Sequence, residues 1–285
     1  MRFRHVVRLP THQVRPRAES QDTCYMNVSI SIPPIDLAEL DNRAAARRRA
    51  QREAIAEPGR FNAISLVEWL PRVAAAGVPH IPAESVFELA QEVWLHFDAP
   101  EEQHWPVWEG LQNAVASVPA SHMVRWDFCA SLSLKGALAR AEAPGDALRD
   151  LSPDDPRAFD ILYEYPGEMV PVLRRPWVPA LHEDGYPVEF RAFVRESKVI
   201  AVASYYPQRP LCDTPQMQVF VSKVQSLSRT IVEHLTATGH YPWLMGFERQ
   251  FKAGTVNATL DFLVRDDGEV VFIEAGPPFG AGAHP

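Results

Sequence analysis

Two carboxylates near the C-terminus, Asp261 and Glu274, are placed so that they could bind a metal ion. Residues 255–264 alternate and residues 270–273 are apolar, and the Asp-Gly pair between them is typical of a two-residue hairpin loop. With that loop, Asp261 pairs directly with Glu274. Facing carboxylates repel unless a cation lies between them, and Mg²⁺ with bound phosphates prefers such ligands. The alternative is a solvent-exposed hairpin in which the register differs by one or two residues.

A second hairpin is predicted over residues 188–205, with its turn at residues 196–197. Regular pairing through this turn places Glu189 opposite Ser204 and puts both on one face with Arg191. The apolar face would then hold Val188, Phe190, Ala192 and Val194. An arginine beside a glutamate on a sheet is commonly a structural ion pair. The alternative is that Arg191 binds a phosphate or carboxylate through its guanidinium fork.

Lysine is scarce, because the chain has only Lys135, Lys198, Lys223 and Lys252. Lys135 lies early in a helix predicted over residues 131–142. A helical lysine is usually solvated, but this one is the best placed to meet a ligand bound against the C-terminal hairpins. The sequence contains none of four common motifs: zinc-ligand spacing, a nucleophile elbow, a Walker loop or a dinucleotide fingerprint.

Composition narrows the class of protein. The chain has 285 residues, 46% of them hydrophobic, and a net charge of −8, which argues against a protein that coats nucleic acid. Residues 1–60 carry a net charge of +4 and the remainder −12. The sequence shows neither a signal peptide nor a membrane-spanning run. Three widely spaced cysteines suggest neither a disulfide framework nor a zinc site. We therefore expect a cytoplasmic protein.

The predicted elements must bring these residues together. We expect an irregular or partly extended arm over residues 1–35 and helices over residues 36–57 and 65–76. The tryptophan-rich stretch that follows is interpreted as core. A long helix begins at Thr214-Pro215 and ends at Gly239, and its apolar residues form one face. Two hairpins with a long helix between them predict an α+β fold in which a helix covers one face of an antiparallel sheet.

The order of these motifs resembles the ATP-grasp superfamily. The resemblance covers residues 121–285. It rests on motifs that follow one another along the chain: a lysine, a linker, the strand Val-Glu-Phe-Arg-Ala-Phe-Val at 188–194 and a long helix. Two segments with one acid each then follow, Asp-Phe-Leu-Val at 261–264 and Val-Phe-Ile-Glu at 271–274. It implies two α+β lobes with mostly antiparallel sheets that clamp ATP and Mg²⁺ in a cleft. The expected divisions are an arm and helix (1–60), an N-terminal lobe (61–175) and a C-terminal lobe (176–285).

The resemblance also implies roles for single residues. Lys135 would hold phosphates, and Arg191 would contact the phosphate as the catalytic residue. Glu189 would contact the ribose or lie behind the metal ligands. Adenine would lie against the linker residues Pro176, Trp177 and Val178. The metal ligands would be Asp261 and Glu274.

Two departures from the family pattern bear on activity. Many members have an asparagine where this chain has Gly276, and no glycine-rich phosphate loop lies between Lys135 and the linker. The motif order is also similar to that of a group of cell-division-cycle proteins that assist assembly of a translation initiation factor.

Three functions follow as hypotheses. The first is an ATP-dependent carboxylate–amine or carboxylate–thiol ligase that works through an acyl phosphate. The second is an assembly or interaction module that binds ATP without turnover. The third is a plain α+β domain in which the charges form surface pairs. The expected partners are a small-molecule or peptide carboxylate, or a protein client. Neither a membrane nor a nucleic acid is expected.

Overall fold

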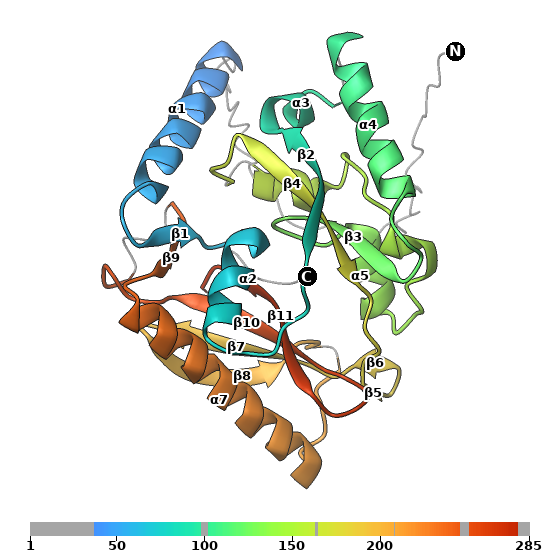
Figure 1. The fold of residues 1–285 in the computed structure, drawn as a ribbon, viewed down its shortest axis with the longest axis vertical. Coiled ribbons are helices and arrows are strands. Elements are labelled where there is room, and N and C mark those ends of the chain that lie inside the picture. Colours follow the sequence, from blue (N-terminus) through green and yellow to red (C-terminus); the bar gives the residue numbers. More distant parts are fainter. Residues whose placement is uncertain (1–36, 98–101, 163–164, 208, 246–250, 279–285) are drawn as a thin grey trace, which may run out of the picture. The chain divides into compact units, whose positions relative to one another are not determined.

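The computed structural model describes residues 37–97, 102–162, 165–207, 209–245 and 251–278 (Figure 1). The chain divides after Leu37, and the fold below belongs to the unit Ala38–Pro285. The predicted arm at residues 1–35 lies outside the described residues. The predicted α+β class with mostly antiparallel sheets is confirmed. None of the described helices is both long enough and apolar enough to cross a bilayer.

The elements alternate along the chain rather than falling into separate helical and strand regions. The helices are α1 (Leu37–Ile55), α2 (Leu66–Ala75), α3 (Gln91–Leu95), η1 (Glu102–His104), α4 (Trp105–Ala116), α5 (Leu132–Ala139), η2 (Gly145–Leu148), α6 (Pro156–Leu162) and α7 (Pro215–Ala237). The strands are β1 (Arg60–Asn62), β2 (Glu84–Ala90), β3 (His122–Trp126), β4 (Met169–Pro176), β5 (His182–Glu183), β6 (Tyr186–Pro187), β7 (Glu189–Arg195), β8 (Lys198–Ser204), β9 (Tyr241–Trp243), β10 (Ala258–Val264) and β11 (Val270–Gly276).

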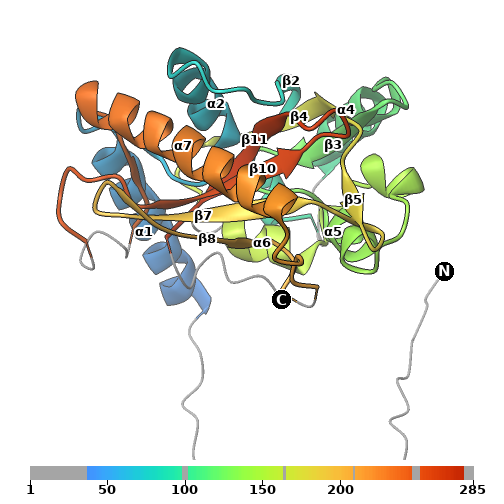
Figure 2. The same cartoon turned by 90° about the horizontal axis from the view of Figure 1, so that it is seen from below.

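A four-stranded antiparallel sheet of order β11-β10-β7-β8 forms the C-terminal part of the fold. Helix α7 lies along one face of it, as Figure 2 shows, and α2 packs on the same core. The predicted apolar face of β7 is confirmed, because all four of its residues lie in this core. The opposite face carries the charged residues.

Helices α2 and α7 begin as their sequences predict. The Ser65 hydroxyl accepts a hydrogen bond from the Glu68 amide at 3.3 Å, and the Thr214 hydroxyl accepts one from the Met217 amide at 3.2 Å. Helix α2 precedes the first sheet in the sequence, yet it packs against the core of the second. The division of the chain into an N-terminal lobe that begins at residue 61 and a C-terminal lobe that begins at residue 176 stays a prediction.

A three-stranded antiparallel sheet of order β2-β4-β3 forms the other part. Its core contains Trp94 and Trp126, whose rings lie 3.8 Å apart between centroids. Both indoles are fully buried, in keeping with their interpretation as core residues. Helix α4, which the sequence did not predict, packs on β2 and leaves Trp105 61% exposed.

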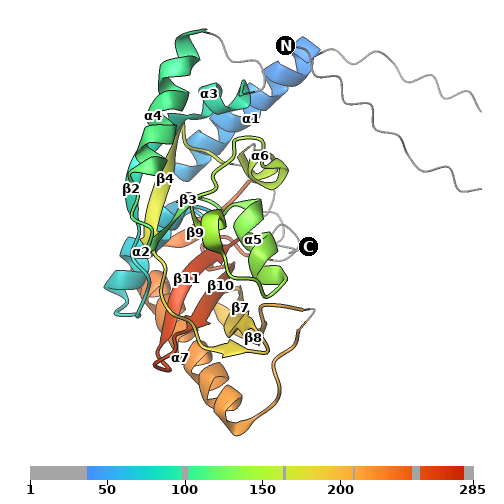
Figure 3. The same ribbon diagram turned by 90° about the vertical axis from the view of Figure 1, so that its right-hand side faces the viewer.

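After the middle strand of this sheet, the chain runs through a linker and the short β5–β6 hairpin to β7 of the second sheet (Figure 3). Residues 177–181 follow β4, and the Leu181 amide donates to the Val264 carbonyl of β10 at 2.9 Å. The Leu181 carbonyl then accepts from the Val188 amide at 2.7 Å. This linker therefore brings the end of β4 beside the charged face of the second sheet.

Two β-bulges set the register around that face. Asp261 pairs with Glu274 as predicted, but Phe262 pairs with Phe272, so Ile273 is an inserted residue. Ile200 is likewise inserted in β8, and Ser204 pairs with Phe190. The prediction that Ser204 lies opposite Glu189 is therefore wrong, because the bulge shifts the register by one residue.

Candidate functional site

The charged face of the second sheet holds an ion pair within the sheet. Arg191 of β7 and Asp261 of β10 are register partners. The Arg191 guanidinium donates from Nε and Nη2 to the two Asp261 carboxylate oxygens, both at 2.7 Å. Asp261 is 1% exposed. Arg191 thus forms its ion pair with Asp261 on the neighbouring strand, not with Glu189 on its own strand.

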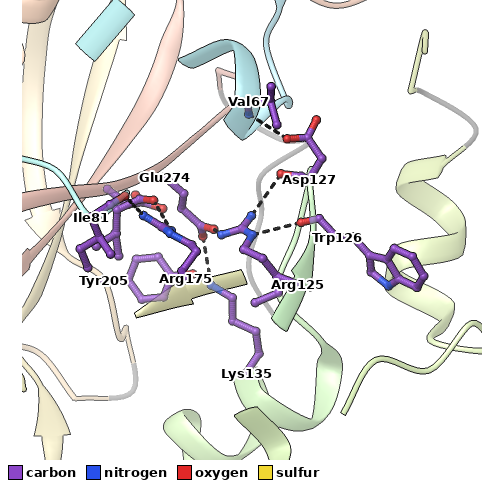
Figure 4. A network of polar contacts seen from close by, with 12 residues as sticks. Val67, Ile81, Arg125, Trp126, Asp127, Lys135, Arg175, Tyr205 and Glu274 are labelled. Carbon is purple, nitrogen blue, oxygen red and sulfur yellow. Dashed lines mark hydrogen bonds and ion pairs between the residues drawn. The ribbon is translucent and has the colours of Figure 1, made fainter. Parts of the chain in front are cut away.

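Glu274 of β11 is held by cations from the other part of the fold. Arg125 of β3 donates from Nη1 to one carboxylate oxygen at 2.8 Å. Lys135 of α5 donates from Nζ to the other at 3.1 Å. Burial opposes ionisation of Glu274, but Lys135 and Arg125 outweigh it and hold its pKa well below the ordinary value. Glu274 is therefore a carboxylate joined to two cations, as Figure 4 shows.

Arg175 is a buried cation without a carboxylate partner among the described residues. It lies near the end of β4 and is 3% exposed. Its two Nη atoms donate to the carbonyls of Ile273 and Ile81, each at 2.7 Å, and its Nε has no hydrogen-bond partner within the described chain. Burial and then the charge of Arg125 lower its pKa to about 9, and the charge of Glu274 opposes this shift. Such a group is costly unless an anion approaches it.

Arg125 is fixed by its own strand and the residues after it. Its Nε donates to the Trp126 carbonyl at 3.1 Å (Figure 4). The next residue, Asp127, is fully buried, and its carboxylate accepts from the Val67 amide of α2 and from the Tyr165 hydroxyl, both at 2.8 Å. Asp127 thereby ties α2, which packs on the second sheet, to the strand that carries Arg125.

Glu189 is a third buried acid at the site. It is 7% exposed and accepts a hydrogen bond from the Tyr206 hydroxyl at 3.1 Å. Burial raises its pKa to about 7; Lys135 opposes this shift, and Asp261 and Glu274 add to it. Glu189 is therefore partly protonated near neutral pH, in contrast to Glu274.

Replacement of Glu189 by glutamine should remove a fall in stability with rising pH. The pKa of Glu189 is raised from 4.5 to about 7, so between these values the folded state holds a proton that the unfolded chain has released. That contribution, about 3 kcal/mol, is present below pH 4.5 and lost as the pH rises through 7. Urea unfolding at pH 5 and pH 8 measures the free energy of unfolding of both proteins. Between these pH values, the wild type should lose more of it than the Glu189→Gln variant. If the stability of the wild type instead rose relative to that of the variant as the pH increased, the raised pKa of Glu189 would be contradicted.

A pocket brings the linker and the charged residues together. It has a volume of about 580 Å³ including its open mouth, and its polar wall is formed by Arg125, Lys135, Arg175, Glu189 and Glu274. Its apolar wall includes Pro176, Trp177 and Val178. An adjoining pocket shares Trp177, Val178 and Glu189. A flat apolar group would lie against the linker while an anionic group reached the cations.

Six of the residues proposed from the sequence line this pocket: Lys135, Pro176, Trp177, Val178, Glu189 and Glu274. The other two, Arg191 and Asp261, do not line it, but Asp261 is the register partner of both Arg191 and Glu274. Sequence reasoning missed Arg125, Arg175 and Tyr205. Arg175 had a signal, since it directly precedes the linker proline Pro176. Arg125 had a weaker one, as a charged residue within an apolar strand. Tyr205 had none, because its orientation depends on the bulge at Ile200.

Asp261 and Glu274 are the residues that would hold a magnesium ion arriving with phosphates, and they would then share oxygens that are now bonded to Arg191, Arg125 and Lys135. Among the described residues, no group of three or more His, Cys, Asp or Glu side chains could by itself hold a metal. Asp261 and Glu274 do lie directly opposite each other, and Mg²⁺ is commonly bound by one or two carboxylates plus substrate phosphates. Four cations here outnumber two ionised acids and the partly protonated Glu189, so the surplus is between one and two positive charges, fewer than the negative charges of a triphosphate. A divalent cation would offset most of the remaining negative charge.

Comparisons with known proteins find similarity only to solved structures. No family model matches the sequence, and no curated protein matches it. C-terminally truncated Cdc123 from Schizosaccharomyces pombe is 13% identical, with a TM-score of 0.42 over 75% of this chain and 83% of that one.

Two further similar structures are longer than this chain. N5-carboxyaminoimidazole synthase from Aspergillus clavatus, solved with ADP and 5-aminoimidazole ribonucleotide, is 11% identical, with a TM-score of 0.39 over 78% of this chain and 46% of that one. A RimK-domain ATP-grasp protein from Sphaerobacter thermophilus is 13% identical, with a TM-score of 0.37 over 75% of this chain and 58% of that one. This chain spans less than two thirds of both. The similar structures thus include Cdc123 and a protein described as ATP-grasp.

Proposed function

We propose that the unit 38–285 binds ATP together with Mg²⁺ in the pocket between the linker and the charged face. The observation that carries the proposal is Arg175, a buried guanidinium that lines the pocket and forms no ion pair within the described chain. A phosphate group is the anion that best supplies the missing charge. Arg125 and Lys135, which line the same pocket, would bind the neighbouring phosphate oxygens.

The remaining residues take roles that fit their positions. Pro176, Trp177 and Val178 form an apolar wall for the adenine. Glu189 lines the same pocket and also the adjoining one beside the linker, where it can accept a hydrogen bond from the ribose or donate one when protonated. Asp261 and Glu274 would hold the Mg²⁺, which neutralises phosphate charge when bound.

The reaction that we propose is ATP-dependent ligation. A carboxylate oxygen of the acceptor attacks the γ-phosphorus, the bond to the β–γ bridging oxygen breaks, and ADP leaves. An amine or thiol then attacks the acyl carbon of the acyl phosphate and releases phosphate. Lys135, Arg125 and Arg175 would hold the phosphates, and Arg191, oriented by Asp261, would stabilise the transferred group. The acceptor would be a small-molecule or peptide carboxylate.

An ATP-binding module without turnover is the second candidate. Gly276 offers no side-chain ligand where many ATP-grasp proteins supply a third metal ligand, and the sequence has no glycine-rich loop to cover the phosphates. Both features favour binding over chemistry. Its partner would be a protein client, and a cytoplasmic location would suit both candidates.

ATP with Mg²⁺ should raise the melting temperature of the wild-type protein. A ligand that binds only the folded state adds about 2.7 kcal/mol at 100 times its dissociation constant. Differential scanning fluorimetry measures the shift. Lys135→Ala should abolish most of it, because Lys135 lies at the cation cluster. Lys223→Ala is the matched control, since Lys223 is exposed on α7, and it should retain the full shift. An unchanged wild-type melting temperature would refute nucleotide binding.

Release of ADP or AMP separates the two candidates. The protein would be incubated with ATP, Mg²⁺ and pools of amino acids or small carboxylates, and the nucleotides would be separated by chromatography. Carboxylate-dependent ADP release supports the ligase, and AMP release would exclude an acyl phosphate in favour of an acyl adenylate. A thermal shift without any release supports the binding module.

A further inference from the structure

We propose that Tyr205 is a positioning residue that holds Lys135 and Arg191 in the orientation from which they meet the phosphates. This inference rests on the proposed function. The Tyr205 hydroxyl accepts a hydrogen bond from the Lys135 ammonium at 2.8 Å. The centre of its ring lies 5.1 Å from Lys135 Nζ and 5.0 Å from Arg191 Cζ. One side chain of the second sheet thus contacts a cation from each part of the fold.

The bulge in β8 turns Tyr205 toward the site. Because Ile200 is inserted, Ser204 pairs with Phe190 and faces the α7 side. Tyr205 follows it, and its amide donates to the Glu189 carbonyl at 3.0 Å, which places the ring on the charged face. Without the inserted residue, that position would belong to Ser204, which has no aromatic ring.

The phenol ring is itself held in place. Tyr205 is 8% exposed and packs edge to face on Tyr206, with 5.1 Å between ring centres. The Tyr206 hydroxyl is bonded to Glu189. The orientation of Tyr205 is therefore fixed before any ligand binds.

A tyrosine can orient these cations without neutralising them. Burial raises the pKa of Tyr205 to about 12, although Lys135 opposes the shift, so its hydroxyl stays uncharged at neutral pH. A neutral acceptor and a ring face attract a cation while leaving its charge available to a phosphate. Glu274, by contrast, neutralises the charge of Lys135. Its hydrogen bond with Lys135 would have to break or weaken when Lys135 binds phosphates.

The test separates the hydroxyl from the ring. Tyr205→Phe keeps the ring and removes the acceptor, whereas Tyr205→Leu removes both. Isothermal titration calorimetry should show ATP affinity weakened about 10-fold by the first change and further by the second. Tyr241→Phe is the control, because the Tyr241 hydroxyl contacts Arg60 away from the pocket, and its affinity should equal that of wild type.

A second readout follows Lys135 directly in the protein without nucleotide. With only four lysines, ¹⁵N-lysine labelling gives a small set of side-chain Nζ NMR signals, assigned by Lys→Arg variants, and leaves the N–H donors of Lys135 unmodified. The Lys135 signal should shift upon Tyr205→Phe, and the signals of Lys198, Lys223 and Lys252 should not.

The outcomes are distinguishable. An unmoved Lys135 signal, or unchanged ATP affinity in a folded Tyr205→Leu variant, overturns the role of Tyr205. A wild type that binds no ATP refutes the proposed function and the phosphate part of this inference. A moved Lys135 signal in that protein would still support the orienting contact.

Discussion

Arg175→Met should weaken ATP binding about 100-fold. The substitution removes a buried positive charge that faces the pocket without an acidic partner among the described residues. A lost charge-assisted contact to phosphate in a desolvated site costs about 2.7 kcal/mol. The folded protein should change less in stability, because two effects oppose each other. The charge no longer has to be buried, but the Ile81 and Ile273 carbonyls lose their donor.

The neighbouring arginine supplies the control. Arg174 lies on the same strand but is exposed, and it pairs with Glu84. Arg174→Met should leave ATP affinity within a factor of two of wild type. Calorimetry on the two variants gives both values. Equal affinities for Arg175→Met and Arg174→Met would mean that Arg175 does not meet the phosphates.

Asp261→Asn should destabilise the protein by about 3–5 kcal/mol even without nucleotide, because it leaves the Arg191 guanidinium buried without its counter-charge. The Asp261 carboxylate is 1% exposed and accepts two hydrogen bonds of 2.7 Å from Arg191. Denaturant unfolding measures the loss. Glu269→Gln, which disrupts an exposed pair with Arg265 in the same hairpin, should cost less than about 1 kcal/mol.

A double variant distinguishes the pair from other roles of Asp261. Arg191→Met combined with Asp261→Leu removes both charges and keeps apolar volume, so it should recover much of the lost stability. The double variant should not recover ATP binding. A double variant as unstable as Asp261→Asn would show that the ion pair is not the source of the effect.

The sequence predicts best where local signals and the fold agree. The cap and apolar stripe of α7 locate that helix, and the Asp-Gly loop places Asp261 opposite Glu274. The bulges were not predictable, because an inserted residue in a strand has no strong sequence signal. Their effect is nonetheless large: the regular register places Ser204 where Tyr205 lies.

Contacts between the two sheets were equally hidden from the sequence. Arg125 and Glu274 are 149 residues apart, and their 2.8 Å contact depends on how the linker carries the chain from β4 to the second sheet. Sequence spacing fixes neighbours within a hairpin, but it does not fix which strand of another sheet faces them. The sequence therefore predicts Lys135 and Arg191 as cations of the candidate site, but not Arg125 and Arg175.

The inserted Ile200 has a consequence beyond the site. Strand β8 is one of the two outermost strands of its sheet, its segment Val-Ile-Ala-Val is apolar, and Ile200 is 52% exposed. An unbroken edge of this kind is a template on which another chain can add a strand and begin to aggregate. The bulge, with Lys198 beside it, interrupts the regular row of free amides and carbonyls. The irregularity that turns an aromatic ring inward thus also helps to keep neighbouring molecules apart.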